Sequence, residues 1–159
     1  MERRSFLKAA AAGTAIIGSA GKLFAAEQYF PSKVDPALFE NINRVKDPAR
    51  KTPLEKSHAP VITAPEKVTA GEPFIVEISV GEVLHGMGPA HWIEYIELNI
   101  GNEPAARADF QPKGYASPKT SFLVTLHQDA APSGKVTLVA RQRCTLHGYW
   151  ETGRDLTVT

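Results

Sequence analysis

The chain has 159 residues, a length that favours one domain with a core of its own. Hydrophobic residues make up 43% and charged residues 22%, as in ordinary globular proteins, and 12 Pro with 12 Gly predict many turns. The formal net charge is only +1 and no basic stripe is visible, which argues against nucleic acid as a partner.

The first 26 residues differ in composition from the rest of the chain. A charged start with Arg3 and Arg4 leads into a weakly apolar run and then small residues, an arrangement typical of a signal peptide. The paired arginines, with Phe6-Leu7-Lys8 after them, resemble the twin-arginine export signal. The alternative, a short N-terminal helix of the domain, is disfavoured because the run has no polar face. We therefore expect a periplasmic protein whose residues 1–26 are removed.

Removal of this leader changes the charge and leaves no membrane anchor. The leader holds four basic groups and one acidic group, so the remainder carries 14 basic and 16 acidic groups, a net charge of −2. The apolar run is interrupted by Lys22 and is short for a membrane span, which needs about 20 predominantly apolar residues. We expect no stable membrane association.

Residues 27–52 are expected to form an N-terminal arm. Asp35 is a suitable N-cap and Pro36 a suitable first helical residue, so we predict one short helix over 35–42. Residues 44–56 are polar and rich in proline, a composition typical of a loop.

From residue 53 to 159 we expect one domain built of strands. Apolar and polar residues alternate with a period of two, which predicts half-buried strands separated by turns. The expected strands lie at 61–64, 74–80, 92–100, 120–126, 135–143 and 156–158. About seven short strands without alternating helices predict an all-β immunoglobulin-like sandwich.

Scarce metal-ligand residues are concentrated at two places. His85 and His91 precede one expected strand, and Cys144 and His147 follow another, in a chain with one Cys and five His. Loops at one end of a sandwich are a common place for a site. The clustering predicts a metal site rather than scattered structural residues, with His58 as a possible further ligand from a third loop.

The ligand set favours iron over zinc. A single cysteine cannot form an internal disulfide, so its thiol is either buried and inert or bound to a metal. Four imidazoles and one thiolate exceed the four ligands that zinc takes in structural sites. Four imidazoles in a plane with a thiolate below would leave a sixth position on iron for a small oxidant.

These clusters resemble the signature of the superoxide reductases, of the neelaredoxin type and of the matching domain of desulfoferrodoxin. The signature is His85, then His91-Trp92-Ile93-Glu94-Tyr95-Ile96-Glu97-Leu98, then Cys144-Thr145-Leu146-His147-Gly148-Tyr149-Trp150. The likeness extends over about residues 53–158, and the family fold is an immunoglobulin-like sandwich. It implies one non-haem iron per chain, with equatorial ligands His58, His85, His91 and His147 and with Cys144 axial.

The resemblance also implies a reaction and its partners. It is the one-electron reduction of superoxide to hydrogen peroxide, with two protons and an external electron donor such as a small redox protein. We also expect a homo-oligomer. A four-cysteine iron centre, found in desulfoferrodoxins, is excluded because Cys144 is the sole cysteine.

Catalytic roles for Lys56 and Glu55 are implied by the same resemblance, but with a departure. Family members commonly have Glu-Lys-His, where the lysine steers superoxide and the glutamate can occupy the sixth position; here Ser57 is inserted. If the loop bulges at Ser57, Lys56 still points at the iron. The glycine that follows His85 replaces the usual proline and loosens that loop.

Two other classes of protein are alternatives. A blue-copper electron carrier needs two His, one Cys and usually a Met after the Cys-His loop, but no Met follows Met87. We expect Met87 to have a packing role. A non-catalytic metal-binding module is the other alternative, and His127, without ligand neighbours, is expected at the surface.

Overall fold

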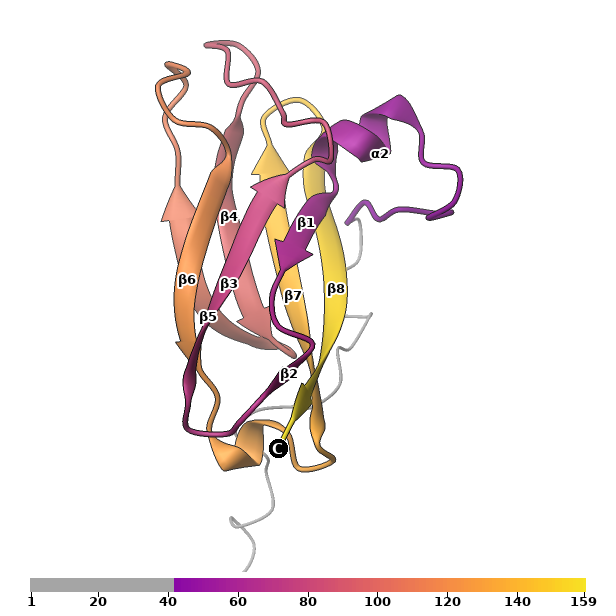
Figure 1. Ribbon diagram of the computed structural model, residues 1–159. Coiled ribbons are helices and arrows are strands. Elements are labelled where there is room, and N and C mark those ends of the chain that lie inside the picture. Colours follow the sequence, from indigo (N-terminus) through magenta and orange to yellow (C-terminus); the bar gives the residue numbers. More distant parts are fainter. Residues whose placement is uncertain (1–41) are drawn as a thin grey trace, which may run out of the picture.

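A computed structural model describes residues 42–159, which fold into two facing β-sheets (Figure 1). One sheet has the strand order β1-β3-β6 and the other the order β2-β8-β7-β4-β5. The strands are β1 (Pro60–Thr63), β2 (Lys67–Val68), β3 (Pro73–Val80), β4 (Ile93–Ile100), β5 (Glu103–Asp109), β6 (Lys119–Thr125), β7 (Lys135–Cys144) and β8 (Gly148–Val158), with helix α2 (Pro53–His58) and the 3-10 helix η3 (Gln128–Ala130). The prediction of an all-β, immunoglobulin-like sandwich is confirmed.

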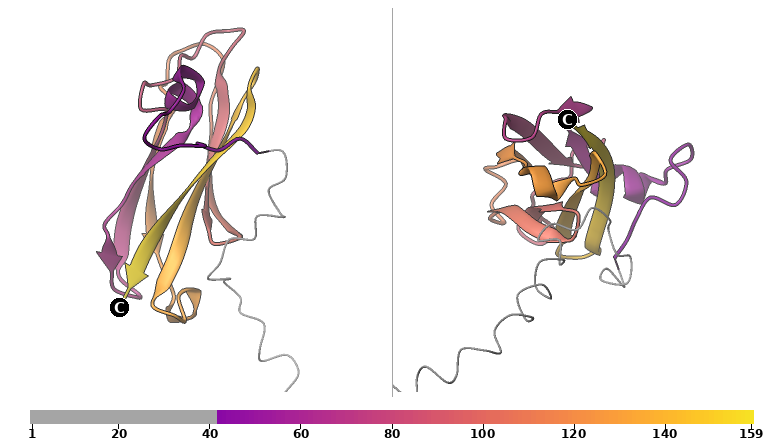
Figure 2. Two further views of the ribbon diagram at one scale, coloured as in Figure 1. Left: turned by 90° about the vertical axis from the view of Figure 1, so that its right-hand side faces the viewer. Right: turned by 90° about the horizontal axis from the view of Figure 1, so that it is seen from below.

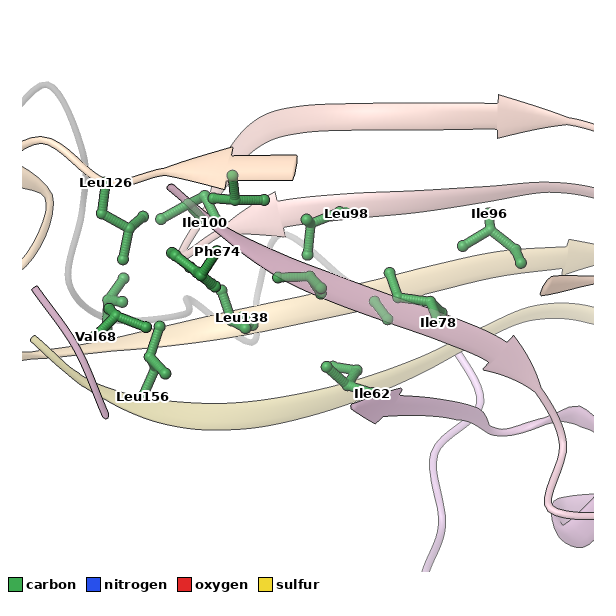
Figure 3. Close-up of a cluster of buried hydrophobic side chains, with 14 of the residues drawn as sticks. Ile62, Val68, Phe74, Ile78, Ile96, Leu98, Ile100, Leu126, Leu138 and Leu156 are labelled. Carbon is green, nitrogen blue, oxygen red and sulfur yellow. The ribbon is translucent and has the colours of Figure 1, made fainter. Parts of the chain in front are cut away.

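Alternating apolar side chains of the two sheets build the core. On β3 the inward residues Phe74, Val76, Ile78 and Val80 are buried. The residues between them are exposed (Ile75) or partly buried (Glu77 and Ser79). Figure 3 shows such side chains converging between the sheets, and Figure 2 shows the strands enclosing this core when seen along the long axis. Each fully buried Val or Ile contributes about 1.5–3 kcal/mol relative to exposure.

The longest strand pairing among residues 42–159 positions the end of the sandwich that carries the predicted ligands. β7 and β8 form an antiparallel hairpin whose last register pair is Cys144 with Gly148, and β4 pairs with β7 so that Ile93 lies opposite Cys144. Gly148 has φ +69°, a conformation that glycine adopts without strain at the exit of a tight turn. The turn 145–147 is therefore anchored on two strands of the larger sheet.

The structure adds elements that the hydrophobic pattern did not indicate. β5 is mostly exposed and carries no apolar alternation, so no periodic signal marks it. β2 has only two residues, and β8 begins at Gly148 instead of 156 because its first half alternates weakly. The prediction of a loop over 44–56 is wrong for residues 53–56, because helix α2 begins at Pro53.

The N-terminal part of the chain is described only from residue 42. Asn43 pairs in parallel with Trp150, and Arg44 forms an ion pair with Glu151 at 2.9 Å, so this segment lies against β8. The predicted helix over 35–42 and the leader 1–26 fall outside the described residues. Between residues 42 and 159, no helix is long and apolar enough to cross a membrane.

Candidate metal centre

All five predicted ligand residues lie at one end of the sandwich. His58 is the last residue of α2, His85 and His91 belong to the segment that joins β3 to β4, and Cys144 and His147 flank the β7–β8 turn. Figure 1 shows α2 and these connections side by side at that end. Residues that are 89 positions apart in sequence therefore meet through the topology of the two sheets.

The ligand atoms converge on one point. The Nε2 atoms of His85 and His91 are 3.1 Å apart, and Cys144 Sγ lies 3.0 Å from His91 Nε2. The same sulfur lies 3.7 Å from His85 Nε2 and 3.5 Å from His147 Nδ1. Ligand atoms of His58, His91, Cys144 and His147 lie within 4.8 Å of one another. Such separations match donors that share one ion, because metal–nitrogen and metal–sulfur bonds are about 2.0–2.3 Å.

The four imidazoles form a square. Neighbouring ring centroids are 4.6 Å apart for His58–His85, 4.5 Å for His85–His91, 4.9 Å for His91–His147 and 4.5 Å for His58–His147. The rings of His58 and His91, on one diagonal, are 5.9 Å apart and nearly parallel at 23°. Successive rings meet edge to face, so four nitrogen atoms can bind one ion in a plane.

Cys144 closes this square from the core side. Its side chain is fully buried and belongs to the hydrophobic core, whereas His91 and His147 are only partly buried. Solvent therefore reaches the cluster on the side away from the sulfur. The sulfur therefore lies on the core side of the cluster and the partly buried imidazoles of His91 and His147 lie toward the surface.

Three of the imidazoles, those of His58, His85 and His91, have a lowered pKa, which favours the neutral form that binds metals. Burial, opposed by the hydrogen bond to the Leu54 carbonyl and assisted by the neighbouring imidazoles, lowers the pKa of His58 to about 4. Burial also lowers the pKa of His85 and of His91, in both cases helped by nearby imidazoles. Neutral imidazoles need not release a proton before they bind an ion.

Backbone carbonyls orient two of the rings toward the centre. His58 Nδ1 donates to Leu54 O at 2.9 Å, and His85 Nδ1 donates to Gly86 O, so each Nε2 presents its lone pair to the cluster. His58 Nε2 is buried and has no hydrogen-bond partner among the described residues. A buried acceptor of this kind is costly unless something binds it, and a metal ion at the centre of the square would do so.

Hydrogen bonds between segments fix the ligand positions. Thr145 N donates to Trp92 O at 3.1 Å and Trp92 N donates to Thr145 Oγ1 at 3.2 Å, which ties the two ligand-bearing connections together. The Nε2 of Gln142, a fully buried residue two positions before Cys144, donates to His58 O at 3.0 Å. Trp150 donates to His147 O at 3.1 Å and its ring lies 5.4 Å from His58.

Gln142 is a site residue that the sequence interpretation missed. It occupies an inward position of β7, between Ala140 and Cys144, where the alternation would place an apolar side chain. A polar residue at an inward position next to a predicted ligand was the available signal. The hydrogen bond from Gln142 to the His58 carbonyl could not be predicted, because most of α2 was predicted as a loop.

Glu55 is engaged in capping α2. Its carboxylate accepts from Thr52 N at 2.7 Å and from Lys46 N at 3.0 Å, and the Thr52 side chain accepts from Glu55 N, which completes a capping box. These backbone hydrogen bonds, first that from Lys46, lower the pKa of Glu55. Both carboxylate oxygens are therefore occupied at the start of the helix, while His58 lies at its end.

Lys56 is exposed on the same helix. No bulge occurs at Ser57, which continues the regular helical turn and whose Oγ lies 2.8 Å from His58 Nδ1. Since a helix turns by about 100° per residue, Lys56 and His58 point about 200° apart. Steering of superoxide by Lys56 and a sixth-position role for Glu55 stay predictions. The bulge at Ser57 that would let Lys56 point at the iron is not present, because α2 is regular there.

The remaining residues singled out in the sequence lie apart from the cluster. Met87 packs against the core, and its sulfur accepts from Ile93 N at 3.4 Å, in agreement with a packing role. His127 is exposed beside η3, at the opposite end from α2 in Figure 1. Trp150 is buried against His58, whereas Trp92 and Tyr95 are partly buried.

Comparison with known proteins gives a consistent result. The family described as Desulfoferrodoxin matches residues 50–153. A protein of Methanocaldococcus jannaschii is 37% identical over 118 residues, covering 72% of this chain and 92% of its own length. Desulfoferrodoxin of Nitratidesulfovibrio vulgaris is 31% identical over 97 residues, covering 61% of this chain and 62% of its own.

Solved structures agree with the sequence matches. A superoxide reductase (neelaredoxin) from Ignicoccus hospitalis is similar with a TM-score of 0.61 and 35% identity, covering 74% of this chain and 95% of its own. A neelaredoxin from Archaeoglobus fulgidus, at 23% identity and a TM-score of 0.52, covers 68% and 95% and shows the fold alone. The family match spans most of the strands and all five ligand residues, and the chain belongs to the desulfoferrodoxin family.

Proposed function

We propose that this protein is a superoxide reductase. It reduces superoxide by one electron, with two protons, to hydrogen peroxide, and it releases no oxygen. The observation that carries the proposal is the square of four imidazoles closed on the core side by the Cys144 sulfur. The similar protein from Ignicoccus hospitalis bears the name of this activity, which supports the proposal.

One iron per chain fits this donor set. His58, His85, His91 and His147 would hold it through imidazole nitrogen, and Cys144 would hold it through sulfur. Iron bound there would supply a one-electron couple between its ferrous and ferric forms. Thiolate sulfur and imidazole nitrogen suit iron, and five donors exceed the four that a structural zinc site takes.

The chain's own residues carry out the other tasks. Carbonyls of Leu54 and Gly86 hold two imidazoles in the tautomer that faces the ion. The core keeps water away from the Cys144 sulfur, whereas the partly buried rings of His91 and His147 form the side of the cluster that a small oxidant can reach. Lys56 remains a candidate for steering superoxide and Glu55 a candidate for the sixth position, although neither is placed there by a contact.

The geometry disfavours the copper alternative. A blue-copper site uses two His and one Cys in a trigonal arrangement with a weak axial sulfur. Here four imidazoles surround the centre, and the Met87 sulfur is engaged with the Ile93 amide. A non-catalytic module with a structural metal would not need this surplus of ligand residues.

Metal analysis with a rapid-mixing assay tests the proposed function. We expect about one iron per chain and, after oxidation, a thiolate-to-iron charge-transfer band in the visible. Pulsed superoxide mixed with the reduced protein should be consumed in a second-order reaction that yields one hydrogen peroxide per superoxide. Stoichiometric copper without iron, or evolution of oxygen, would overturn the proposal.

Export, the electron donor and assembly complete the proposal. Arg3, Arg4 and the small residues that end the leader support export by the twin-arginine route to the periplasm. The electrons come from an external small redox protein, and the protein works as a homo-oligomer without stable membrane association. Replacing both arginines by lysine should leave precursor in the cytoplasm; normal export would contradict this part.

A further inference from the structure

Residues 43–46 contact two of the elements that carry predicted ligands. In Figure 1 this segment lies beside β8, after which the chain loops outward and returns as α2. Asn43 N donates to Tyr149 O at 2.9 Å and Glu151 N donates to Asn43 O at 3.0 Å. These bonds form a parallel bridge to β8 directly after the β7–β8 turn. We call residues 43–46 the strap.

The side chain of Asn43 holds the backbone of a ligand residue. Its Nδ2 donates to His147 O at 3.2 Å and to Tyr149 O at 2.9 Å. The carbonyl of His147 also accepts from Trp150 Nε1 at 3.1 Å. Two side chains therefore fix the carbonyl of the residue whose imidazole belongs to the square.

The ring of His147 depends on this backbone more than the rings of His58 and His85 do. Those two rings each donate from Nδ1 to a backbone carbonyl, which orients them directly. Among the described residues, the His147 ring has no carbonyl partner, and its Nδ1 lies 3.5 Å from Cys144 Sγ. The backbone of the β7–β8 turn therefore sets the direction of this ring, and whatever supports that backbone acts on the ligand.

The other end of the strap holds the start of α2. Lys46 N donates to Glu55 Oε1 at 3.0 Å, within the carboxylate that caps the helix. In the middle of the strap, Arg44 binds the Glu151 carboxylate of β8 at 2.9 Å. Glu151 is only 6% exposed, so its side of the ion pair is shielded from water. The strap is thus anchored to the fold through Asn43, Arg44 and Lys46.

We propose that the strap sets the position of His147 relative to His58, with Asn43 as the positioning residue that acts through the His147 carbonyl. His58 ends the helix whose start the strap holds, and the ring centroids of His58 and His147 are 4.5 Å apart. One segment of four residues therefore links the elements that carry two adjacent donors of the square. This inference rests on the metal centre of the proposed function, but not on its reaction.

Removal of the Asn43 amide is the direct test. Asn43→Leu keeps the approximate shape of the side chain and removes both Nδ2 hydrogen bonds, while the backbone pairing with β8 remains. We expect the affinity for ferrous iron, measured by competition with a chelator, to fall about 10-fold, as when a ligand loses its hydrogen-bond partner. The visible band of the oxidised protein should shift, because the His147 ring changes its direction. A wild type that binds iron but does not reduce superoxide would contradict the proposed function and leave this test intact.

A matched control separates positioning from stability. Arg154, further along β8, donates to the carbonyls of Ile62 at 3.0 Å and Ala64 at 2.7 Å, at the end of β1 away from α2. Arg154→Met removes these two hydrogen bonds and should lower the free energy of unfolding, but it should change iron affinity by less than about twofold, since no ligand is involved. Unchanged iron affinity in Asn43→Leu, or an equal loss in both variants, would overturn the proposal.

A double-mutant cycle tests the strap as a unit. Glu55→Gln weakens the contact at the other end of the strap, because a neutral amide oxygen accepts less strongly than a carboxylate, and it should lower iron affinity. If one strap carries both effects, Asn43→Leu and Glu55→Gln together should lower the affinity by less than the product of their separate factors. No loss in Glu55→Gln, or a combined loss equal to that product, would show that the two ends act independently and would refute the strap.

Discussion

The cluster of metal-ligand residues draws its members from regions of the fold that are built differently, and two of these regions can be compared. Cys144 and His147 stand on the β7–β8 hairpin, whose strands are paired along the whole of β7 and whose first strand also pairs with β4. His58 stands on α2, a helix of six residues, which is too short to be stable in isolation.

The second region depends on a few specific contacts. The capping box of Thr52 and Glu55 holds the start of α2, and the Gln142 amide holds its end by donating to His58 O. Cys144 therefore belongs to the rigid core, whereas the position of His58 depends on local hydrogen bonds.

Removal of the Cys144 sulfur should have the largest effect. We expect Cys144→Ser to lose the visible charge-transfer band and to slow superoxide reduction by more than about 100-fold, since loss of a ligand exceeds the 10–100-fold effect of changing a ligand's hydrogen-bond partner. The sandwich should stay folded, because Cys144 ends a strand that is paired on both sides. Stopped-flow mixing with superoxide and circular dichroism measure both, and an unchanged rate would remove Cys144 from the site.

Loss of the Gln142 hydrogen bond should loosen the helix without touching a ligand. Gln142→Met keeps the volume but leaves His58 O without its donor, so we expect iron affinity to fall about 10-fold and stability by about 1–3 kcal/mol. Competition with a chelator measures the affinity. Asn99→Leu is the matched control, since it removes another buried amide whose nitrogen has no partner. Equal iron loss in both variants would contradict a positioning role for Gln142.

The capping box should make α2 sensitive to acid. The pKa of Glu55 is lowered in the fold, so its contribution to stability is present above its ordinary value of 4.5 and is lost as pH falls through the folded value. Glu55→Gln should therefore unfold at a lower temperature than the wild type at pH 7, and the difference should vanish at low pH. Thermal unfolding between pH 7 and 3.5 measures this; a constant difference would exclude the carboxylate as its source.

The smallest effect is expected at Lys56. Because the helix directs Lys56 about 200° away from His58, Lys56→Ala should change the rate constant for superoxide by less than about twofold and leave its salt dependence unaltered. The rate constants at several salt concentrations decide this. A clear fall with a flatter salt dependence would instead support steering by Lys56, as the resemblance implies.

Much of the fold and of the ligand set could be predicted from the sequence. The period of two in the runs that became β3, β6 and β7 indicated a sandwich, since one face of each strand is buried. The scarcity of Cys and His made their clustering visible, and the spacing of His85 with His91 and of Cys144 with His147 identified two ligand pairs. These signals are local, because each depends on residues close together in the chain.

Only the tertiary structure decided how these parts meet. The edge strand β5 has no apolar face to mark it, and α2 depends on a capping box and on a buried amide that reaches it from β7. The square of imidazoles needs His58 to approach residues 27 to 89 positions away. The sequence by itself determined which side chains can bind the metal, whereas pairing of distant strands decided their distances and directions, because no local pattern encodes the contacts between segments far apart in the chain.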